Sequence, residues 1–243
     1  MKIAVILPAA GLGTRMGRVS AEKTGTSRKQ FMLLEGVPIL VHTIRKFAAC
    51  EAVSEIVVAL RREDIDWVRE LLGKEALAKP VRVVPGGDSR QQSVENALAT
   101  LEDSVDLVAV HDAVRPFVDV ETIRKTFDEA AQSGAAIVGI VPVDSVKQVT
   151  RGQGSQVKIR GTFPRDKLVL AQTPQVFRLS LLREAFRSAR EDGFTATDEA
   201  SLVERMEQVE VTVVLGSDRN IKITKPSDME LARLFLALET AAV

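Results

Sequence analysis

Near its start the chain reads IAVILPAAGLGTR over residues 3–15, an apolar and partly β-branched run that leads into two glycines. A short run of this kind is typical of a parallel strand that is covered on both faces. Glycines beyond the carboxyl end of such a strand let backbone N–H groups approach phosphate oxygens closely. We therefore expect a first strand over Ile3–Leu7 and a phosphate-binding loop from Ala9 to Arg15.

Similar apolar runs recur along the chain, and amphipathic stretches mostly separate them. The runs predict further strands at Ile56–Leu60, Val81–Val84, Leu107–Val110, Ala136–Val141 and Val209–Leu215. The amphipathic stretches predict helices at Pro38–Ala49, Asp64–Leu72, Arg90–Thr100, Val120–Ser133 and Leu179–Arg190, a short one from about Asp198, and a closing one after Pro226. Because crossovers between parallel strands are right-handed, the alternation predicts an α/β fold. It would be doubly wound and Rossmann-like, around a mostly parallel sheet.

The alternation breaks between Pro142 and Ala171. Two polar segments with β-compatible residues, Ser145–Thr150 and Gln156–Arg160, flank the turn-forming stretch Gly152-Gln153-Gly154-Ser155, which predicts a β-hairpin. Its faces offer little apolar surface, so we expect a protruding arm at about residues 143–170 that either lies in solvent or packs on another subunit. Apart from this arm, residues 1–243 suit one domain.

Composition narrows the classes of partner. The 33 Lys and Arg residues balance the 33 Asp and Glu residues, so no overall field recruits nucleic acid or an anionic membrane. The only cysteine, Cys50, leaves no disulfide framework and favours the cytoplasm. The apolar start is too short to cross a bilayer. We expect no nucleic acid and no membrane partner, and an anion site built from locally clustered groups.

Two familiar phosphate loops share glycines with this stretch but fit it poorly. The dinucleotide fingerprint has a third glycine where this chain has Met16, and an acidic ribose ligand where it has Arg61-Arg62. The P-loop requires Gly-Lys-Ser or Gly-Lys-Thr at a fixed interval, and neither follows Gly11 or Gly13. The alternatives that remain are a tight turn without a ligand and a third kind of phosphate loop.

Basic residues near the loop favour the phosphate interpretation. Arg15 directly follows the glycines, and Lys29 ends a polar segment, Arg18–Arg28, whose composition suggests a mobile flap. Together Arg15 and Lys29 can surround a polyphosphate. For Arg18 and Lys23, an ordinary solvated loop is an equally good interpretation.

The motif Pro8-Ala9-Ala10-Gly11-x-Gly13-x-Arg15-Met16-Gly17, followed by Lys29-Gln30-Phe31, resembles the nucleotidyltransferases that activate sugar and polyol phosphates. Later segments follow in the order seen in the 2-C-methyl-D-erythritol 4-phosphate cytidylyltransferase family, and the resemblance extends from Ile3 to about Ala237. These segments are Gly86–Val94, His111–Pro116, Leu170–Gln175, Thr197–Ser201 and Asn220–Lys222.

The resemblance implies a reaction and a set of site residues. The family transfers CMP from CTP to a polyol phosphate, methylerythritol 4-phosphate, and releases pyrophosphate, with Mg²⁺ as cofactor and as a homodimer. Nucleotide binding falls on Ala9, Ala10, Gly11, Gly13, Gly87, Asp88, Ser93, Asp112 and Ala113, and Asp112 is also the expected metal ligand. Catalysis falls on Arg15, Lys29, Arg165 and Lys222. Acceptor binding falls on Arg115, Ser145, Thr173, Thr197 and Asp198, with Ser145 and Arg165 reaching the partner subunit's site from the arm.

Structural roles compete with several of these assignments. Asp or Ser in the stretch before Arg90 could cap the helix that starts there, and Thr197 could cap the next one. Asp112 could be a turn residue, and Arg115 could form a salt bridge at a helix start. Neither histidine is assigned to catalysis, because a phosphate monoester with a second pKa of about 6 is already largely a dianion at neutral pH and needs no general base. We expect His42 in a helix and His111 at a strand end.

Three features depart from the family pattern. The segment Gly17–Arg28 is a long insertion before Lys29, Arg28 stands where proline often precedes the lysine, and Ser145 stands where threonine is usual. None removes a charged group. The rival interpretations are a cytidylyltransferase for ribitol 5-phosphate, a nucleotide-binding protein without turnover, and an oxidoreductase.

Overall fold

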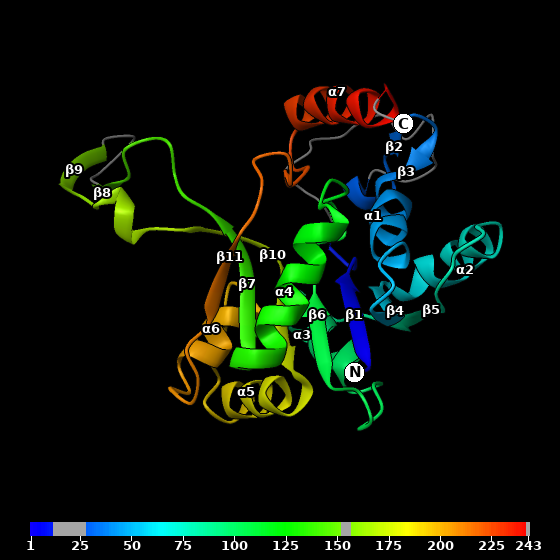
Figure 1. Cartoon of the computed structure of the whole chain (residues 1–243), viewed down its shortest axis with the longest axis horizontal. Helices are drawn as coiled ribbons and strands as arrows, with labels where there is room; N and C mark the ends of the chain where they lie inside the picture. The colour runs from blue at the N-terminus through cyan, green and yellow to red at the C-terminus, as the bar shows by residue number, and fades with distance from the viewer. Residues whose placement is uncertain (12–27, 152–156, 242–243) are drawn as a thin grey trace.

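The structure, a computed structural model, describes residues 1–11, 28–151 and 157–241. Its centre is a seven-stranded sheet with strand order β11-β7-β10-β6-β1-β4-β5, flanked by helices (Figure 1). The strands are β1 (Ile3–Pro8), β4 (Val53–Leu60), β5 (Val81–Pro85), β6 (Leu107–Val110), β7 (Ala135–Ile140), β10 (Leu170–Arg178) and β11 (Thr212–Leu215).

The mostly parallel sheet confirms the predicted fold class. β1 pairs in parallel with β4 and β6, β4 with β5, and β7 with β11. Residues 3–7 are fully buried, as a strand covered on both faces requires. The exception is β10, which the sequence analysis missed: it lies between β6 and β7 and runs antiparallel to both.

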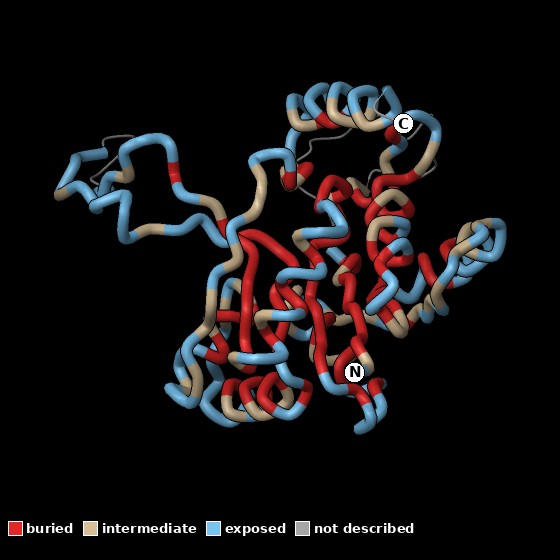
Figure 2. Tube along the Cα trace, viewed as in Figure 1, coloured by how far each residue is buried: buried red, intermediate tan, exposed pale blue. Residues whose placement is uncertain are grey.

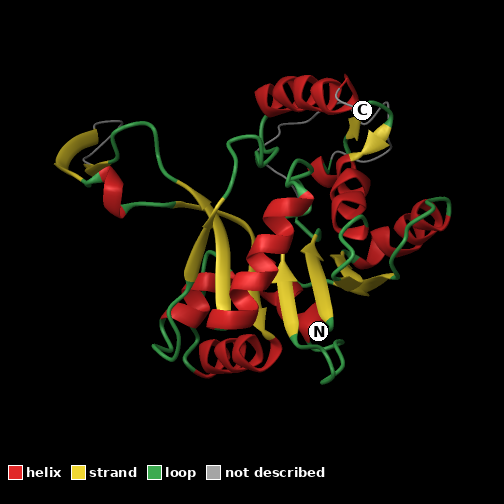
Figure 3. Cartoon of the chain, viewed as in Figure 1, coloured by secondary structure: helices red, strands yellow, loops and turns green. Residues whose placement is uncertain are grey.

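Helices cover both faces of the sheet, as the doubly wound prediction requires (Figure 3). One face packs against α1 (Ile39–Ala48), α2 (Ile65–Gly73) and α4 (Val120–Ser133). The other packs against α3 (Arg90–Leu98), α5 (Leu179–Glu191) and α6 (Glu199–Glu204). Buried residues therefore follow the strands and the inner sides of the helices (Figure 2). None of the helices within the described residues is both long and apolar enough to cross a membrane.

A smaller apolar cluster closes the carboxyl-end side of the sheet. It joins the hairpin formed by β2 (Leu33–Leu34) and β3 (Val37–Pro38) to α7 (Pro226–Ala241) through buried residues that include Ile223 and Met229. Ile223 N donates a hydrogen bond to Val114 O at 3.0 Å. This contact brings the segment before α7 alongside the loop that follows β6.

The predicted hairpin is present as β8 (Lys147–Arg151) and β9 (Val157–Thr162), which pair antiparallel. It projects from the body of the protein on two long connections (Figure 1). Every residue of β8 is exposed. The strands start and end one or two residues later than predicted, because the polar sequence gives no sharp apolar boundary.

Candidate active site

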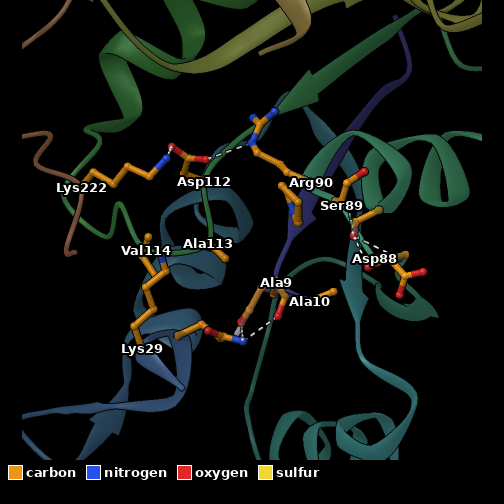
Figure 4. Close-up of a pocket in the computed structure, with 15 residues that line it drawn as sticks. Ala9, Ala10, Lys29, Asp88, Ser89, Arg90, Asp112, Ala113, Val114 and Lys222 are labelled. Carbon is orange, nitrogen blue, oxygen red and sulfur yellow. Dashed lines mark hydrogen bonds and ion pairs between the residues drawn. The ribbon is translucent and has the colours of Figure 1, made fainter. Parts of the chain in front are cut away.

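The carboxyl ends of β1 and β6 lie side by side, since the two strands pair in parallel up to Ile6 and Val110. The loops that follow them meet the end of β5 and the start of α3 in a pocket (Figure 4), which we call the β1 pocket. It is lined by Pro8, Ala9, Ala10, Gly11, Lys29, Gln30, Gly87, Asp88, Ser89, Arg90, Ser93, Asp112, Ala113, Val114 and Lys222. A crevice beyond the carboxyl ends of parallel strands is where α/β proteins bind ligands.

The loop after β1 is held by its carbonyl groups. The buried Gln30 amide donates to Ala9 O at 2.7 Å and, more weakly, to Gly11 O at 3.4 Å. Arg61 Nε donates to Ala10 O at 3.2 Å. Ala9 N also donates to Ala59 O at 2.8 Å. These bonds fix the loop in a form in which the N–H groups after Ala9 can serve an anionic ligand.

The second wall of the β1 pocket is the turn from β5 into α3. Ser93 Oγ accepts from Gly87 N at 3.0 Å and donates to Ser89 O at 2.8 Å. The helix cap is Ser89, whose side chain accepts from Gln92 N. A Cβ on Gly86 would lie 2.7 Å from Ala10 Cβ, so only glycine lets the two loops approach this closely.

Asp112, directly after β6, is the electrostatic centre of the pocket. Its side chain is 9% exposed and faces three cations: Lys222 Nζ lies 2.8 Å from Oδ2, Arg115 Nε 3.3 Å from Oδ2 and Arg90 Nε 3.4 Å from Oδ1. Figure 4 shows Lys222 and Arg90 on opposite sides of the carboxylate. Burial alone would raise the pKa of Asp112, but the three cations hold that pKa well below its usual range.

His111 lines neither pocket and is linked to Asp112 through Thr173. Its Nε2 donates to Arg115 O at 3.0 Å, so Nδ1 accepts from Thr173 Oγ1 at 3.1 Å. Thr173 Oγ1 in turn accepts from Asp112 N at 3.1 Å. Burial lowers the pKa of His111 from 6.5 to about 4, so the ring is neutral at pH 7. His111 is therefore the strand-end hydrogen-bonding group that the sequence predicted.

The lowered pKa of His111 makes stability depend on pH. The unfolded chain protonates this ring below pH 6.5, whereas the folded protein does so only near pH 4. The stabilisation is thus complete above pH 6.5 and falls towards pH 4 by up to about 1.4 kcal/mol per pH unit. We expect the urea midpoint of unfolding, measured with EDTA present, to fall between pH 7 and pH 5. His111→Gln should flatten this dependence more than His42→Gln, and equal slopes for wild type and His111→Gln would contradict the assignment.

A second hollow, the β10 pocket, adjoins the first. It is lined by Arg90, Asp112, Arg115, Ala171, Gln172, Thr173, Gln175, Thr197, Asp198 and Lys222. Arg115 Nη1 donates to Asn220 O at 2.7 Å, which fixes the guanidinium at the pocket wall. The N-cap of α6 is Asp198, which accepts from Ser201 N. The alternative that Thr197 caps this helix is therefore wrong, because the Asp198 carboxylate, one residue later, already accepts from the free N–H group of Ser201.

The two pockets share Arg90, Asp112 and Lys222. Their volumes are about 220 and 260 Å³, each below the range of about 300–1,000 Å³ that is usual for a site holding a small molecule. They are best understood as two halves of one site, with the shared residues at the junction.

Four of the predicted site residues fall elsewhere. Gly13 and Arg15 lie outside the described residues, as does the proposed flap apart from Arg28. Ser145 and Arg165 lie on the connections of the arm and line neither pocket, and Arg165 Nη1 donates to Val143 O. All the others line the β1 pocket, the β10 pocket or both.

Three pocket residues were missed by the sequence analysis, Gln30, Arg90 and Gln175, as was Glu199, which lines neither pocket but pairs with Arg90. Each lies inside one of the motifs quoted above, so the motifs carried the signal. A motif alone does not distinguish a side chain that faces a ligand from one that braces its neighbours, and this difference required the three-dimensional arrangement.

An α/β sheet with a glycine-containing loop after its first strand, and cations gathered around a strand-end carboxylate, is an arrangement typical of a nucleotidyltransferase. The model of the 2-C-methyl-D-erythritol 4-phosphate cytidylyltransferase family matches residues 3–238. The chain belongs to that family.

Relatives of the same name agree along nearly the whole chain. One from Solibacter usitatus (strain Ellin6076) is 66% identical over 241 residues, covering 99% of this chain and 98% of the relative. Another from Acidobacterium capsulatum is 54% identical over 237 residues, covering 97% and 98%. The crystal structure of the Francisella tularensis 2-C-methyl-D-erythritol 4-phosphate cytidylyltransferase matches with a TM-score of 0.77 at 33% identity, over 96% of this chain and 99% of that one. The predicted enzyme class is thereby confirmed.

Proposed function

We propose that this chain transfers the cytidylyl group of CTP to 2-C-methyl-D-erythritol 4-phosphate and releases pyrophosphate, in the synthesis of isoprenoid precursors. The observation that carries the proposal is the pair of pockets that meet at Arg90, Asp112 and Lys222. A transferase needs this arrangement, because donor and acceptor must lie on either side of the group that moves. Family membership supplies the identities of the two substrates.

The β1 pocket is the proposed CTP site. Backbone groups of Ala9, Ala10, Gly11 and Gly13 hold the triphosphate, and Ala113 contacts the ribose. Asp88, with the Gly87 and Ser93 pair that closes the turn, reads the cytosine and the ribose. The support is that all of these except Gly13, which lies outside the described residues, line one pocket with Lys29.

The β10 pocket is the proposed site of the acceptor. Arg115, Thr173, Thr197 and Asp198 line it, and Lys222 stands at its junction with the β1 pocket. The acceptor phosphate is already largely a dianion, so the barrier is the repulsion between two anions. Lys222 aims the acceptor phosphate, while Lys29 and Arg15 stabilise the charge that builds on the transferred group and on pyrophosphate.

Asp112 fits the role of a Mg²⁺ ligand. Magnesium in nucleotide sites is commonly held by one or two carboxylates together with substrate phosphates, and Asp112 is a single carboxylate kept ionised beside the triphosphate loop. When bound, the ion would neutralise charge on the phosphates. Lys222, whose side chain is 34% exposed, can leave Asp112 for the acceptor phosphate.

We further propose a homodimer formed through the arm. Val143 and Ile159 are 82% and 67% exposed there, and exposed apolar side chains gathered on one projection suit a surface that a second copy covers. Ser145 and Arg165 then act at the partner's acceptor site, as the family resemblance implies. The buried, unpaired Cys50 suits a reducing compartment, and we place the reaction in the cytoplasm.

An assay of the purified chain tests the reaction. We expect release of pyrophosphate from CTP with Mg²⁺ when 2-C-methyl-D-erythritol 4-phosphate is present, and little release with ribitol 5-phosphate. The site gives a reason for selectivity at the donor as well: a small pocket that matches cytosine rejects a purine, so ATP should replace CTP poorly. Turnover with ribitol 5-phosphate alone would overturn the choice of acceptor, and no CTP-dependent release with either acceptor would overturn the transferase assignment.

A further inference from the structure

Arg90 occupies a position that none of the roles above uses. It is the first residue of α3, directly after the Ser89 cap, and its side chain reaches the wall that the two pockets share. In Figure 4 it lies across the pocket from Lys222, with Asp112 between them. A group at this wall can contact whatever passes from the donor side to the acceptor side.

The guanidinium of Arg90 forms an ion pair with the carboxylate of Glu199. Nη1 lies 2.7 Å from Glu199 Oε1 and Nη2 lies 2.9 Å from Oε2, which is the bidentate geometry of a strong arginine–carboxylate pair. Nε adds a longer contact of 3.4 Å to Asp112 Oδ1. A guanidinium has five N–H donors, so two remain that pair with nothing else within the described part of the chain.

Glu199 is itself fixed by buried groups. Its side chain is 1% exposed, and its backbone N donates to Gln175 Oε1 at 3.1 Å. The same Gln175 oxygen accepts from Ala200 N, and the Gln175 amide donates to Asp198 Oδ2 at 2.8 Å. Gln175 lies on β10 and is 1% exposed. The backbone that carries Glu199 is thus bonded to the central sheet, in addition to its place in the short helix α6.

The burial of this pair indicates what it contributes. Desolvation of two charges offsets most of their attraction, so a buried ion pair is a weak source of net stability compared with apolar side chains of the same size. What the pair does supply is a fixed orientation for Arg90 at the junction of the two pockets. A mere link between α3 and α6 would not require that the arginine also line both pockets.

We propose that Arg90 is a further catalytic residue, whose remaining N–H donors contact the phosphoryl group as it passes between the pockets, and that Glu199 is the positioning residue for Arg90. This inference rests on the proposed function. In the step concerned, an oxygen of the acceptor phosphate forms a bond to the α-phosphorus of CTP. The bond from that phosphorus to the bridging oxygen breaks, and its electron pair leaves with pyrophosphate. Arg90 neutralises charge on the non-bridging oxygens and transfers no proton.

Glu199→Gln tests the positioning role, because it keeps the shape of the side chain and removes the second strong acceptor. We expect kcat to fall by about 10-fold, in the lower part of the range seen when a residue that orients a functional group is replaced. The KM for CTP should change by less than about threefold, since interactions made only in the transition state affect kcat rather than KM. Arg90→Ala should lower kcat by about 10²–10³.

A matched control removes a carboxylate from α3, the helix that carries Arg90. Glu95 of α3 pairs with Arg190 of α5 at 2.8 Å, away from both pockets. Glu95→Gln should leave kcat within about twofold of wild type, as for an exposed ion pair. If Glu199→Gln acted only by removing a negative charge, the opposite result would be expected. One fewer negative charge near anionic substrates would strengthen their binding and would not lower kcat.

A double-mutant cycle separates positioning from a structural role. If Glu199 acts through Arg90, the double variant Glu199→Gln/Arg90→Ala is no slower than Arg90→Ala alone. Losses of kcat that multiply, or a lowered melting temperature with unchanged kcat in Glu199→Gln, would overturn the inference. If Glu199→Gln does not fold, Arg90→Lys carries the test, since lysine cannot form the bidentate pair; wild-type kcat in Arg90→Lys and Arg90→Ala would again overturn it. A wild-type chain without turnover would instead contradict the proposed function itself.

Discussion

Replacing Lys29 by alanine should leave the protein folded and lower its turnover by about 10²–10³, which is the usual cost of removing one donor that stabilises transition-state charge. Lys29 begins the short 3₁₀ helix η2 (Lys29–Phe31) and lines the β1 pocket. The next residue, Gln30, is bonded to the carbonyls of Ala9 and Gly11, so the backbone of Lys29 is fixed relative to the loop after β1. Pyrophosphate release in a single turnover measures the effect.

A surface lysine provides the control for this experiment. Lys79 donates to Glu51 O at 2.8 Å, is partly exposed, and lines neither the β1 pocket nor the β10 pocket. Lys79→Ala should retain wild-type turnover, and both variants should melt within a few degrees of wild type, because neither change disturbs the core. Near-normal turnover in Lys29→Ala, at full occupancy by CTP, would remove Lys29 from the transition state.

Replacing Asp112 by asparagine should affect both activity and stability. The variant leaves Lys222, Arg90 and Arg115 around a buried group that carries no charge. Breaking a buried ion pair on one side costs about 3–5 kcal/mol, and we expect a loss of unfolding free energy near the lower end, since Lys222 is partly exposed. Turnover should fall by at least about 10³, because the proposed metal ligand is lost together with the order of the cations.

Calorimetry and unfolding distinguish the two effects of this variant. In the presence of CTP, we expect wild type to bind Mg²⁺ and Asp112→Asn to bind it weakly or not at all. Asp103 offers the contrast for stability, because it is exposed and pairs with Arg183 at the surface. Asp103→Asn should change the unfolding free energy by less than about 1 kcal/mol. Unaltered Mg²⁺ binding by Asp112→Asn would contradict the assignment of the metal ligand.

The elements with a clear period were predictable from the sequence. β1, β4, β5, β6 and β7 are apolar runs, interrupted only by Ser54 and Glu55 in β4, by Arg82 in β5 and by Gly139 in β7, and α1 to α5 carry one apolar face each. Their positions were therefore predicted to within a few residues. Both histidines also lie where expected, His42 inside α1 and His111 at the end of β6. Burial on both faces leaves a strong local signal, and this signal is what pattern reasoning detects.

β10 was not predictable by the same means. Its sequence, Leu170–Arg178, contains Pro174 and three polar residues in its interior, which argues against a central strand. The polar residues are there because Gln172, Thr173 and Gln175 serve the β10 pocket and its supports, and they are buried because other polar groups satisfy them. Local propensity therefore fails at this strand because the strand also builds the site.

The candidate site divides in a similar way. Residues carried by the motifs, such as Asp112 and Lys222, do come together although 110 positions separate them (222 minus 112). The bidentate ion pair between Glu199 and Arg90 could not be inferred from the sequence, because it depends on the packing of α3 and α6 on the same face of the sheet. The motifs show which residues are present, but the orientation of a guanidinium depends on contacts between elements that are far apart in the sequence.

The central position of β10 determines the order in which the strands of the sheet can pair during synthesis of the chain. When the chain has been synthesised as far as Ile140, β6 and β7 are complete. These two strands are not neighbours in the sheet, and β10, which lies between them, has not yet been synthesised. Until residues 170–178 emerge, β6 presents an open apolar edge, which is a site where incomplete chains can associate wrongly. Apart from Lys222, the residues that line the β1 pocket are made by Val114, whereas the β10 pocket waits for the residues from Ala171 onwards, in the last third of synthesis.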